Sequence, residues 1–362
     1  MLTGSPSGPA AKAADGPPRI NTYKGQDRAL RADRIGTPGL LLSVLAASAP
    51  LMVVAGVMPT TYAVMGLVGQ PLLFVILGLV MILFSVGYAE MSRHVHNAGA
   101  FYAYIARGLG GAAGTGAAFV ALVSYNAMQI GVYGIFGYEA SSLLDQHLGI
   151  LLPWWVPALA ALAATGVLGA LKIDLNARVL GVLLAIECLL VVICDIAFAA
   201  DPGPEGLSLY AFNPETLGGT GLGTALCFTI AAFVGFEMAP VYAEETNRPH
   251  KLVPRVMFIS VAFVAVFFAF SSWLMGVATG PGRIVASAQQ DGPGLIFGLT
   301  EARLGGTFAD TLHILFLTGI FACMLSFHNV VARYTFAMGR EGLLPSVVGR
   351  TSRSSGAPML GS

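Results

Sequence analysis

Apolar segments of about 20 residues or more recur along the chain, and short stretches that carry most of its charges separate them. A helix of that length crosses the roughly 30 Å hydrocarbon core of a bilayer. The pattern therefore predicts an all-α integral membrane protein with about eight transmembrane helices. The predicted spans are residues 39–66, 71–90, 112–138, 153–171, 177–200, 222–243, 254–279 and 307–334.

Composition supports a protein embedded in the lipid bilayer. Of the 362 residues, 56% are hydrophobic and only 10% are charged, whereas an average soluble domain is roughly 25% charged. The formal net charge is zero, so no nucleic-acid partner is expected.

The chain divides into three parts. Residues 1–38 are rich in Gly, Pro, Ala and charge and have no apolar stretch near Met1, which predicts a disordered cytoplasmic N-terminal tail and not a cleaved signal peptide. Residues 39–334 are expected to form the transmembrane domain. Residues 335–362 are expected to form a cytoplasmic loop.

The distribution of Lys and Arg predicts the orientation, because basic residues stay on the cytoplasmic side of a membrane. Of the 19 basic residues, 17 lie in the tail and in alternate loops, while the opposite loops carry only Arg283 and Arg303. We therefore expect a multi-pass protein of the cell membrane with a cytoplasmic N-terminus.

Motifs of soluble enzymes are missing from the sequence. It contains no GxxxxGK[ST], HExxH or GxSxG motif, so the chain is not expected to be an enzyme or to hold a cofactor. The four cysteines are scattered within predicted spans and are interpreted as packing residues. His94 and His96 share a loop without a further ligand, so no metal site is expected.

The first predicted span is irregular. An unbroken helix of residues 39–66 would be roughly 42 Å long, well beyond the hydrocarbon core. Its middle, "AASAPLMVVAGVMP", contains Pro50, Gly56 and Pro59. Since proline removes a backbone donor and clashes with the preceding turn, a break is expected near Pro50, with a simple kink as the alternative.

A second irregularity interrupts the sixth span. In "AAFVGFEMAP" the residues Gly235 and Pro240 flank Glu237 near the middle of the predicted membrane. Backbone freed from a helix within lipid must be buried in protein or line a cavity. Two interrupted spans, five apart in order, indicate an inverted-repeat transporter whose substrate binds between the repeats.

Three motifs resemble the amino acid, polyamine and organocation (APC) permease superfamily: "MSRHVHNAGAFYAYIARGLG", "GFEMAPVYAEETNRPHKLVPR" and "NVVARYTFAMGREGLLP". The resemblance extends from about residue 36 to the end. It implies a leucine-transporter-like bundle with broken helices 1 and 6, in which helices 1–5 and 6–10 of twelve form inverted repeats. The chain ends at "SSGAPMLGS", before the expected ninth helix, so the second repeat is incomplete. The chain is therefore expected to be a fragment or a truncated relative.

The resemblance also implies a substrate site at the two breaks. Backbone amides of the first break would hold the substrate carboxylate, and the sixth-helix break would receive its amine. Where several relatives place an indole, this chain has Ala231, so Phe233 or Phe236 would cover the substrate. The substrate-binding residues implied are Ala49, Pro50, Met52, Val53, Val54, Ala55, Gly56, Phe233, Val234, Gly235 and Phe236.

Two carboxylates within the spans are candidates for proton coupling. Glu237 either caps the second half-helix or also titrates during transport and contacts the substrate amine. Glu187 occupies the place in the fifth helix where some proton-coupled relatives carry a lysine. The alternative for Glu187 is a structural hydrogen bond.

Other polar residues are weaker candidates. Tyr125, Asn126 and Gln129 form a patch on the third span that is interpreted either as part of the substrate site or as interhelical hydrogen bonding. Ser326, His328 and Asn329 would lie near a vestigial ion position, while Glu90 and Asp195 are expected near the membrane surfaces.

The sequence thus predicts a secondary active transporter for amino acids or small amines, working by proton-coupled symport or exchange through alternating access. The alternative is a non-transporting permease-like remnant, membrane sensor or scaffold. The identity of the substrate, the coupling ion and the oligomeric state stay open at this point.

Overall fold

A computed structural model of the chain describes residues 36–95, 97–170, 173–219 and 221–350. All regular secondary structure in these residues is helical, which confirms the all-α class. Of the expected tail of residues 1–38, residues 1–35 lie outside the described part of the chain. The first helix begins at Thr37. The expected C-terminal loop is described only to residue 350.

Seven helical segments are long and apolar enough to cross a membrane. The first runs from Thr37 to Met65 and consists of α1 (Thr37–Ser48), α2 (Pro50–Met52), the π-helix η2 (Val53–Val57) and α3 (Met58–Met65). The fifth in order, Leu222–Glu245, consists of α9 (Leu222–Ala232) and the 3-10 helix η5 (Phe236–Glu245). The other five are α4 (Gln70–His94), α6 (Gly111–Leu148), α8 (Ile173–Ala200, spanning from Gly181), α10 (Pro249–Thr279) and α13 (Gly306–Arg340).

The span expected at residues 153–171 begins two residues later than predicted, and its last residue lies outside the described part of the chain. Helix α7 covers Trp155–Ala170, which is 16 residues, or about 24 Å of helix and less than the hydrocarbon thickness. The described chain therefore has seven full-length candidate spans and one short apolar helix.

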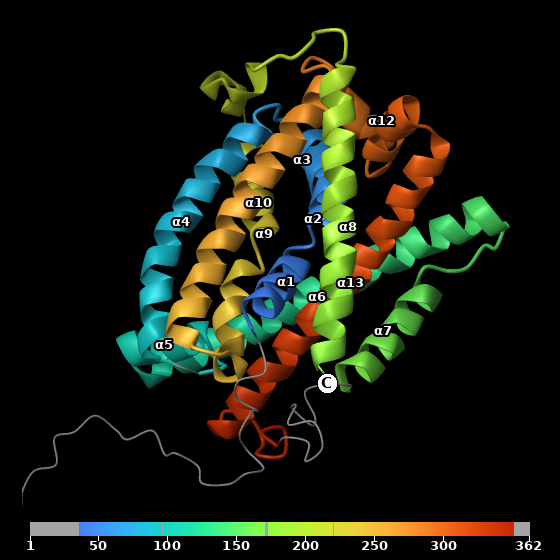
Figure 1. Cartoon of the computed structure of the whole chain (residues 1–362). Helices are drawn as coiled ribbons and strands as arrows, with labels where there is room; N and C mark the ends of the chain where they lie inside the picture. Colours follow the sequence, from blue (N-terminus) through green and yellow to red (C-terminus); the bar gives the residue numbers. More distant parts are fainter. Residues whose placement is uncertain (1–35, 96, 171–172, 220, 351–362) are drawn as a thin grey trace, which may run out of the picture.

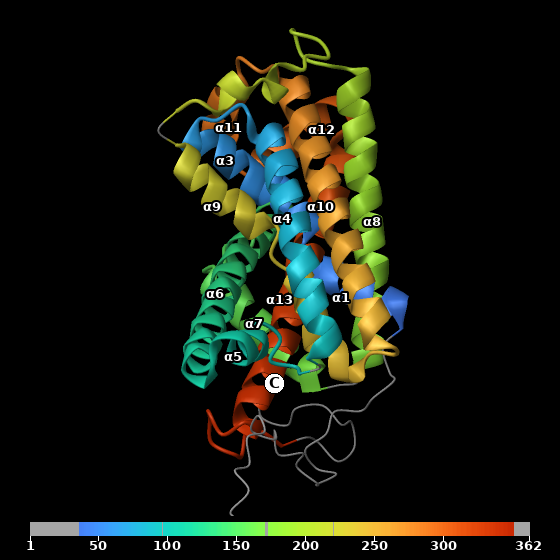
Figure 2. The ribbon, with the colours of Figure 1, turned by 90° about the vertical axis from the view of Figure 1, so that its left-hand side faces the viewer.

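Long helices stand side by side around the interrupted first segment (Figure 1). Helix α10 packs along α4, α1 packs against α8 and α13, and α6 packs against α13, α7 and α5 (Phe101–Leu109). Helices α5 and α7 lie at the lower end of the view. Seen from the side, the lower end of α6 diverges from α4, and α9 lies above α6 (Figure 2). The short elements η3 (Tyr210–Phe212), η4 (Pro214–Leu217), α11 (Ile284–Asp291) and α12 (Gly294–Leu304) lie at the upper end.

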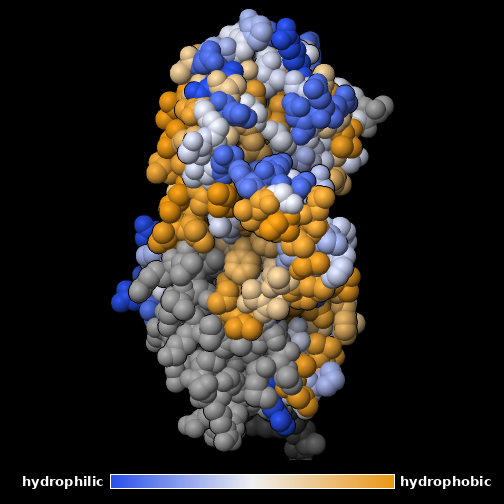
Figure 3. Space-filling view, turned by 90° about the vertical axis from the view of Figure 1, so that its right-hand side faces the viewer, coloured by the Kyte–Doolittle hydropathy of each residue, from blue (hydrophilic) through white to orange (hydrophobic). Residues whose placement is uncertain are grey.

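The outer surface of the bundle is apolar over much of its height. On one face, hydrophobic residues gather across the middle, and hydrophilic residues gather mainly at the upper end (Figure 3). Large apolar side chains such as Leu83, Val120 and Ile130 are at least 67% exposed on α4 and α6. Exposed apolar surface of this extent suits contact with lipid. The protein is thus a multi-pass membrane protein, as expected.

Both interruptions expected from the sequence are present. Ala49 adopts left-handed backbone (φ 41°, ψ 66°) between α1 and α2. The following Pro50 disfavours right-handed helix at this residue. In the segment Leu222–Glu245, which is the sixth span predicted from the sequence, α9 ends at Ala232, and Gly235 has a φ of 126°. The chain then continues as the 3-10 helix η5, with Pro240 inside it, and not as the α-helix that was expected.

Candidate functional site

The two interruptions touch each other. A Cβ atom at Gly235 would lie 2.6 Å from Ser48 Oγ and 3.1 Å from the carbonyl oxygen of Val44. Only glycine therefore fits here, both for its positive φ and for its close approach to α1. The end of α1 and the start of η5 form one buried junction at the centre of the bundle.

Glu237 caps the start of η5. Its Oε2 accepts a 2.7 Å hydrogen bond from the backbone amide of Gly235, and its Oε1 accepts a 3.0 Å hydrogen bond from the Tyr125 hydroxyl. Tyr88 donates to the carbonyl oxygen of Glu237 at 3.0 Å. The residue is only 6% exposed. Capping was one interpretation of Glu237, and these contacts agree with it.

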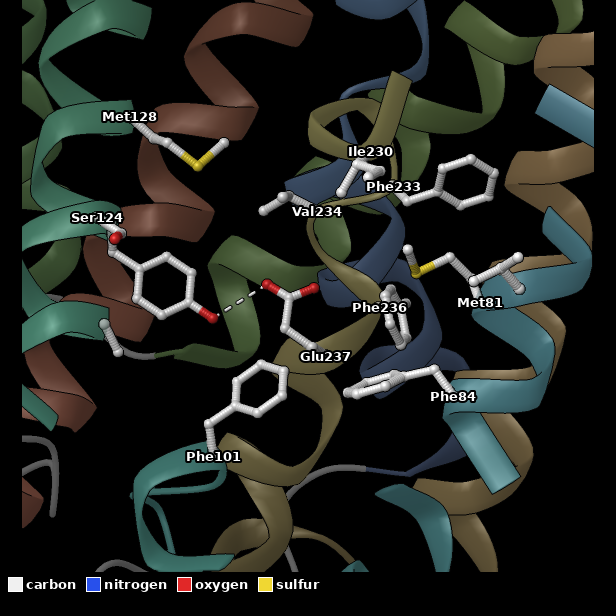
Figure 4. Close-up of a pocket in the computed structure, with 13 residues that line it drawn as sticks. Met81, Phe84, Phe101, Ser124, Met128, Ile230, Phe233, Val234, Phe236 and Glu237 are labelled. Atoms are coloured by element: carbon white, nitrogen blue, oxygen red, sulfur yellow. Dashed lines mark hydrogen bonds between the residues drawn. The ribbon is translucent and has the colours of Figure 1, made fainter. Parts of the chain in front are cut away.

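A cavity of about 410 Å³ adjoins Glu237 (Figure 4). Its volume lies within the roughly 300–1,000 Å³ typical of small-molecule sites. Helices α4, α5 and α6 form one part of the wall, and α9 with the start of η5 forms the other. The polar lining residues are Ser124, Tyr125 and Glu237, and the aromatic ones besides Tyr125 are Phe84, Phe101, Phe233 and Phe236.

Five residues singled out in the sequence line this cavity. They are Tyr125, Phe233, Val234, Phe236 and Glu237. Gly235 instead faces Ser48. Gln129 lies further along α6, is 8% exposed and donates to the Tyr133 hydroxyl at 3.5 Å. Asn126 is exposed and donates to the Leu122 carbonyl of its own helix, away from the site.

The residues of the first break lie apart from this cavity in the described structure. Val53, Val54 and Ala55 are at most 2% exposed, and Pro50 is also buried. Met52 and Gly56 are half-buried, and a Cβ at Gly56 would meet nothing within 4 Å. Pro50, the first residue of α2, has no amide hydrogen. The amides of Leu51 and Met52 have no intrahelical acceptor, as at any helix start. The break therefore offers free amides, but not on the cavity beside Glu237.

Glu187 lies in a second buried place, where α8 meets α13. It is 2% exposed, and a Cβ at Gly319 of α13 would meet both of its carboxylate oxygens. Its Oε1 has no hydrogen-bond partner among the described residues. Cys323, one turn beyond Gly319, donates to the Ala47 carbonyl at 3.5 Å. Glu187 is thus close to the end of α1, and the structural hydrogen bond proposed for it is not seen in the described part.

The remaining candidates are scattered. Ser326 is buried, with no partner for its hydroxyl in the described chain, and His328 packs against Gly169 of α7. The carbonyl of Asn329 accepts from Arg333. Glu90 is exposed and pairs with Arg93 at 3.0 Å.

Asp195, which was expected near a membrane surface, is buried within the protein. It is only 2% exposed, and its Oδ2 accepts a 2.7 Å hydrogen bond from Ser271 of α10. Packing of α10 against α8 buries the carboxylate, which the sequence of α8 alone did not indicate.

Several cavity residues were missed in the sequence. Met81 and Phe84 come from α4, Phe101 from α5, and Ser124 and Met128 from α6. Only Phe101 lies within a motif that the sequence had singled out. The others belong to ordinary apolar spans, in which no local signal separates a cavity wall from a lipid-facing residue.

Two interrupted helices that meet inside a multi-span bundle, beside a cavity, define the class of membrane carriers with broken helices. The chain belongs to the amino acid permease family, whose sequence model matches residues 41–362. The resemblance to APC permeases is thereby confirmed.

Two curated relatives illustrate the family. The low-affinity putrescine importer PlaP of Escherichia coli (strain K12) is 23% identical over 282 residues, which cover 74% of this chain and 58% of that protein. The branched-chain amino acid permease BcaP of Bacillus subtilis (strain 168) is 26% identical over 294 residues, which cover 76% of this chain and 61% of that protein. The aligned part of the chain thus corresponds to about three fifths of each relative.

Proposed function

We propose that the chain is a secondary active transporter for amino acids or small amines in the cell membrane, with a cytoplasmic N-terminus. The observation that carries this proposal is the contact between the two broken helices at Gly235 and Ser48, next to a cavity with a buried carboxylate. The names of PlaP and BcaP, a putrescine importer and a branched-chain amino acid permease, support both substrate classes.

The proposed transport cycle is alternating access around this junction. Phe233, Val234 and Phe236 contact the apolar part of the substrate, Glu237 receives its amine, and Tyr125 holds the Glu237 carboxylate. The amides of the first break, in the segment from Ala49 to Gly56, are proposed to receive a carboxylate in the conformation that brings both breaks to one site. Gln129 is proposed to line that site from α6.

Proton coupling is proposed for Glu187, with Glu237 as a second titrating group. Glu187 is buried against α13, close to the end of α1, and lacks a hydrogen-bond partner among the described residues. Buried carboxylates in membrane proteins are costly unless they are neutral or paired, and they mark proton pathways. A proton that binds at Glu187 would change the packing between the helices that have to move.

Uptake into proteoliposomes tests the proposal. Uptake of radiolabelled putrescine and of leucine is measured under three conditions: an inward proton gradient, an outward proton gradient and no gradient. Accumulation that depends on the purified chain and increases with an inward proton gradient is the expected result. Ligand binding without flux would instead favour a permease-like sensor or scaffold.

A further inference from the structure

The Glu237 cavity has few polar groups, and its only ionisable carboxylate is that of Glu237. Among its lining residues, only Glu237 is acidic, and Tyr125 and Ser124 are the other two with hydrogen-bonding side chains. None of the lining residues is a Lys, Arg or His. An occupant of the cavity therefore meets one carboxylate and two hydroxyls, and no cation.

Glu237 itself has no basic partner in the part of the chain that the structure describes. Both hydrogen bonds of its carboxylate come from neutral donors, the Gly235 amide and the Tyr125 hydroxyl. Two other buried glutamates have a basic partner, Glu245 with Arg333 at 2.6 Å and Glu139 with His313 at 3.0 Å, whereas Glu187 has none among the described residues. Since a buried carboxylate without a cation is unfavourable, a cationic ligand at Glu237 would be strongly favoured.

The rest of the wall is apolar and aromatic. Four phenylalanines and the methionines Met81 and Met128 form most of it. A substrate carboxylate in this cavity would lie near Glu237 without a cation to pair with, and a second ammonium would lie among rings and thioethers. The cavity therefore suits one positive charge on an apolar body.

We propose that this cavity selects primary monoamines with an apolar body, such as branched alkylamines and arylalkylamines, over the amino acids with the same side chain and over diamines. This inference rests on the proposed transport function and narrows its substrate class. The ammonium group donates to the Glu237 carboxylate and to the Tyr125 hydroxyl. The apolar body lies between the phenylalanines and the methionines.

The rim of the cavity agrees with such a ligand. Val80, Phe84 and Ile230 line the cavity and are also 42–48% exposed on α4 and α9. These three apolar residues thus offer exposed surface against which an alkyl or aryl group packs more favourably than a zwitterion. For linear alkylamines, affinity is expected to increase roughly fourfold with each added methylene until the cavity is full.

Matched ligands test the selectivity in the purified full chain in nanodiscs. Equilibrium binding compares 3-methylbutylamine with leucine, phenethylamine with phenylalanine, and both amines with putrescine. Each amine is expected to bind more tightly than its amino acid and than putrescine, by on the order of tenfold or more, because the cavity leaves the extra charge unpaired. Equal or tighter binding of the amino acids would overturn the inference.

Two variants with a control locate the site. Glu237→Gln is expected to abolish amine binding, whereas Glu90→Gln, which changes an exposed carboxylate on α4, is expected to leave it unchanged. Met128→Glu adds a second carboxylate to the same cavity and is expected to increase putrescine binding relative to the monoamines. This gain does not depend on the folding of Glu237→Gln. Unchanged selectivity in a folded Met128→Glu protein would contradict the assignment of the cavity.

Uptake of the same ligands separates this inference from the proposed function. If leucine is transported and the monoamines neither bind nor move, the transport function stands and the inference is wrong. If the monoamines bind in a Glu237-dependent way but no ligand is transported, the inference stands and the proposed function is wrong. Binding of monoamines that Glu237→Gln does not change would assign them to lipid-like occupancy of the apolar walls and overturn the inference.

Discussion

Arg333 of α13 binds Glu245 at the end of η5 through two hydrogen bonds, Nε to Oε1 at 2.6 Å and Nη2 to Oε2 at 3.2 Å. Both side chains are at most 3% exposed, and the guanidinium lies 4.6 Å from the centre of the Tyr242 ring. Seven residues further along α13, Arg340 binds the neighbouring Glu244 at 2.6 and 2.9 Å. The two pairs attach the end of the sixth span to α13.

Breaking the Arg333 pair on one side is expected to destabilise the protein strongly. Arg333→Met leaves Glu245 buried without its cation, which costs about 3–5 kcal/mol. The double variant Arg333→Met, Glu245→Leu removes both charges and is expected to recover much of that loss. Unfolding of the detergent-solubilised protein, followed by thermal or denaturant titration, measures both. Equal stability of the single and double variants would show that the pair is not coupled.

Replacing Gly235 is expected to abolish uptake without preventing membrane insertion. In Gly235→Leu the new side chain would clash with Ser48 and require a positive φ, and strained backbone of this kind costs about 1–3 kcal/mol before any clash is counted. Insertion is measured by size-exclusion chromatography in detergent, and activity by proteoliposome uptake. Gly223→Ala is the control, since a Cβ at that helical position of α9 meets nothing within 4 Å. Normal uptake by Gly235→Leu would refute the role of the junction.

Glu187→Gln is expected to flatten the pH dependence of uptake. In the proposed mechanism, protonation neutralises Glu187, and lower pH on the entry side favours loading. Glutamine is permanently neutral, so the rate would no longer follow the proton gradient. Asp195→Asn is a matched control on the same helix, because Asp195 is equally buried and accepts a hydrogen bond from Ser271. A pH profile of Glu187→Gln identical to that of the unchanged protein would remove Glu187 from the mechanism.

Tyr125→Phe removes one of the two donors to the Glu237 carboxylate while keeping the ring, which packs against Tyr334 at 5.5 Å. A hydrogen bond to a charged group contributes about 1.5–3 kcal/mol, and a loss of stability of that size is expected in detergent unfolding. Tyr138→Phe serves as control, since Tyr138 lies on the same helix and is 65% exposed. A shift of the same size in both variants would argue against the Glu237 contact.

The backbone features of the junction could be predicted from the sequence, whereas its surroundings could not. Proline and glycine act on the local backbone, so Pro50 and Gly235 indicated the two interruptions directly. The walls from α4 and α5 come from segments more than 100 residues away from η5, and their apolar side chains resemble those that face lipid. Arg333 and Glu245 are likewise far apart along the chain, separated by 88 residues.

The composition of the site also depended on tertiary packing. The sequence placed the residues of both breaks in one site, and the structure has only those of the sixth helix on the cavity. The burial of Asp195 could not be predicted, because its position along α8 does not reveal its neighbour Ser271.

Glu237 performs two tasks with one carboxylate, since its Oε2 holds the amide of Gly235 while the side chain borders the cavity. An ammonium that draws Oε2 toward itself competes with a peptide group for the same lone pairs. Gly235 in turn rests directly on Ser48 of α1. The arrival of a ligand would therefore be transmitted to the main chain of both interrupted helices within a single residue, without a relay of intervening side chains.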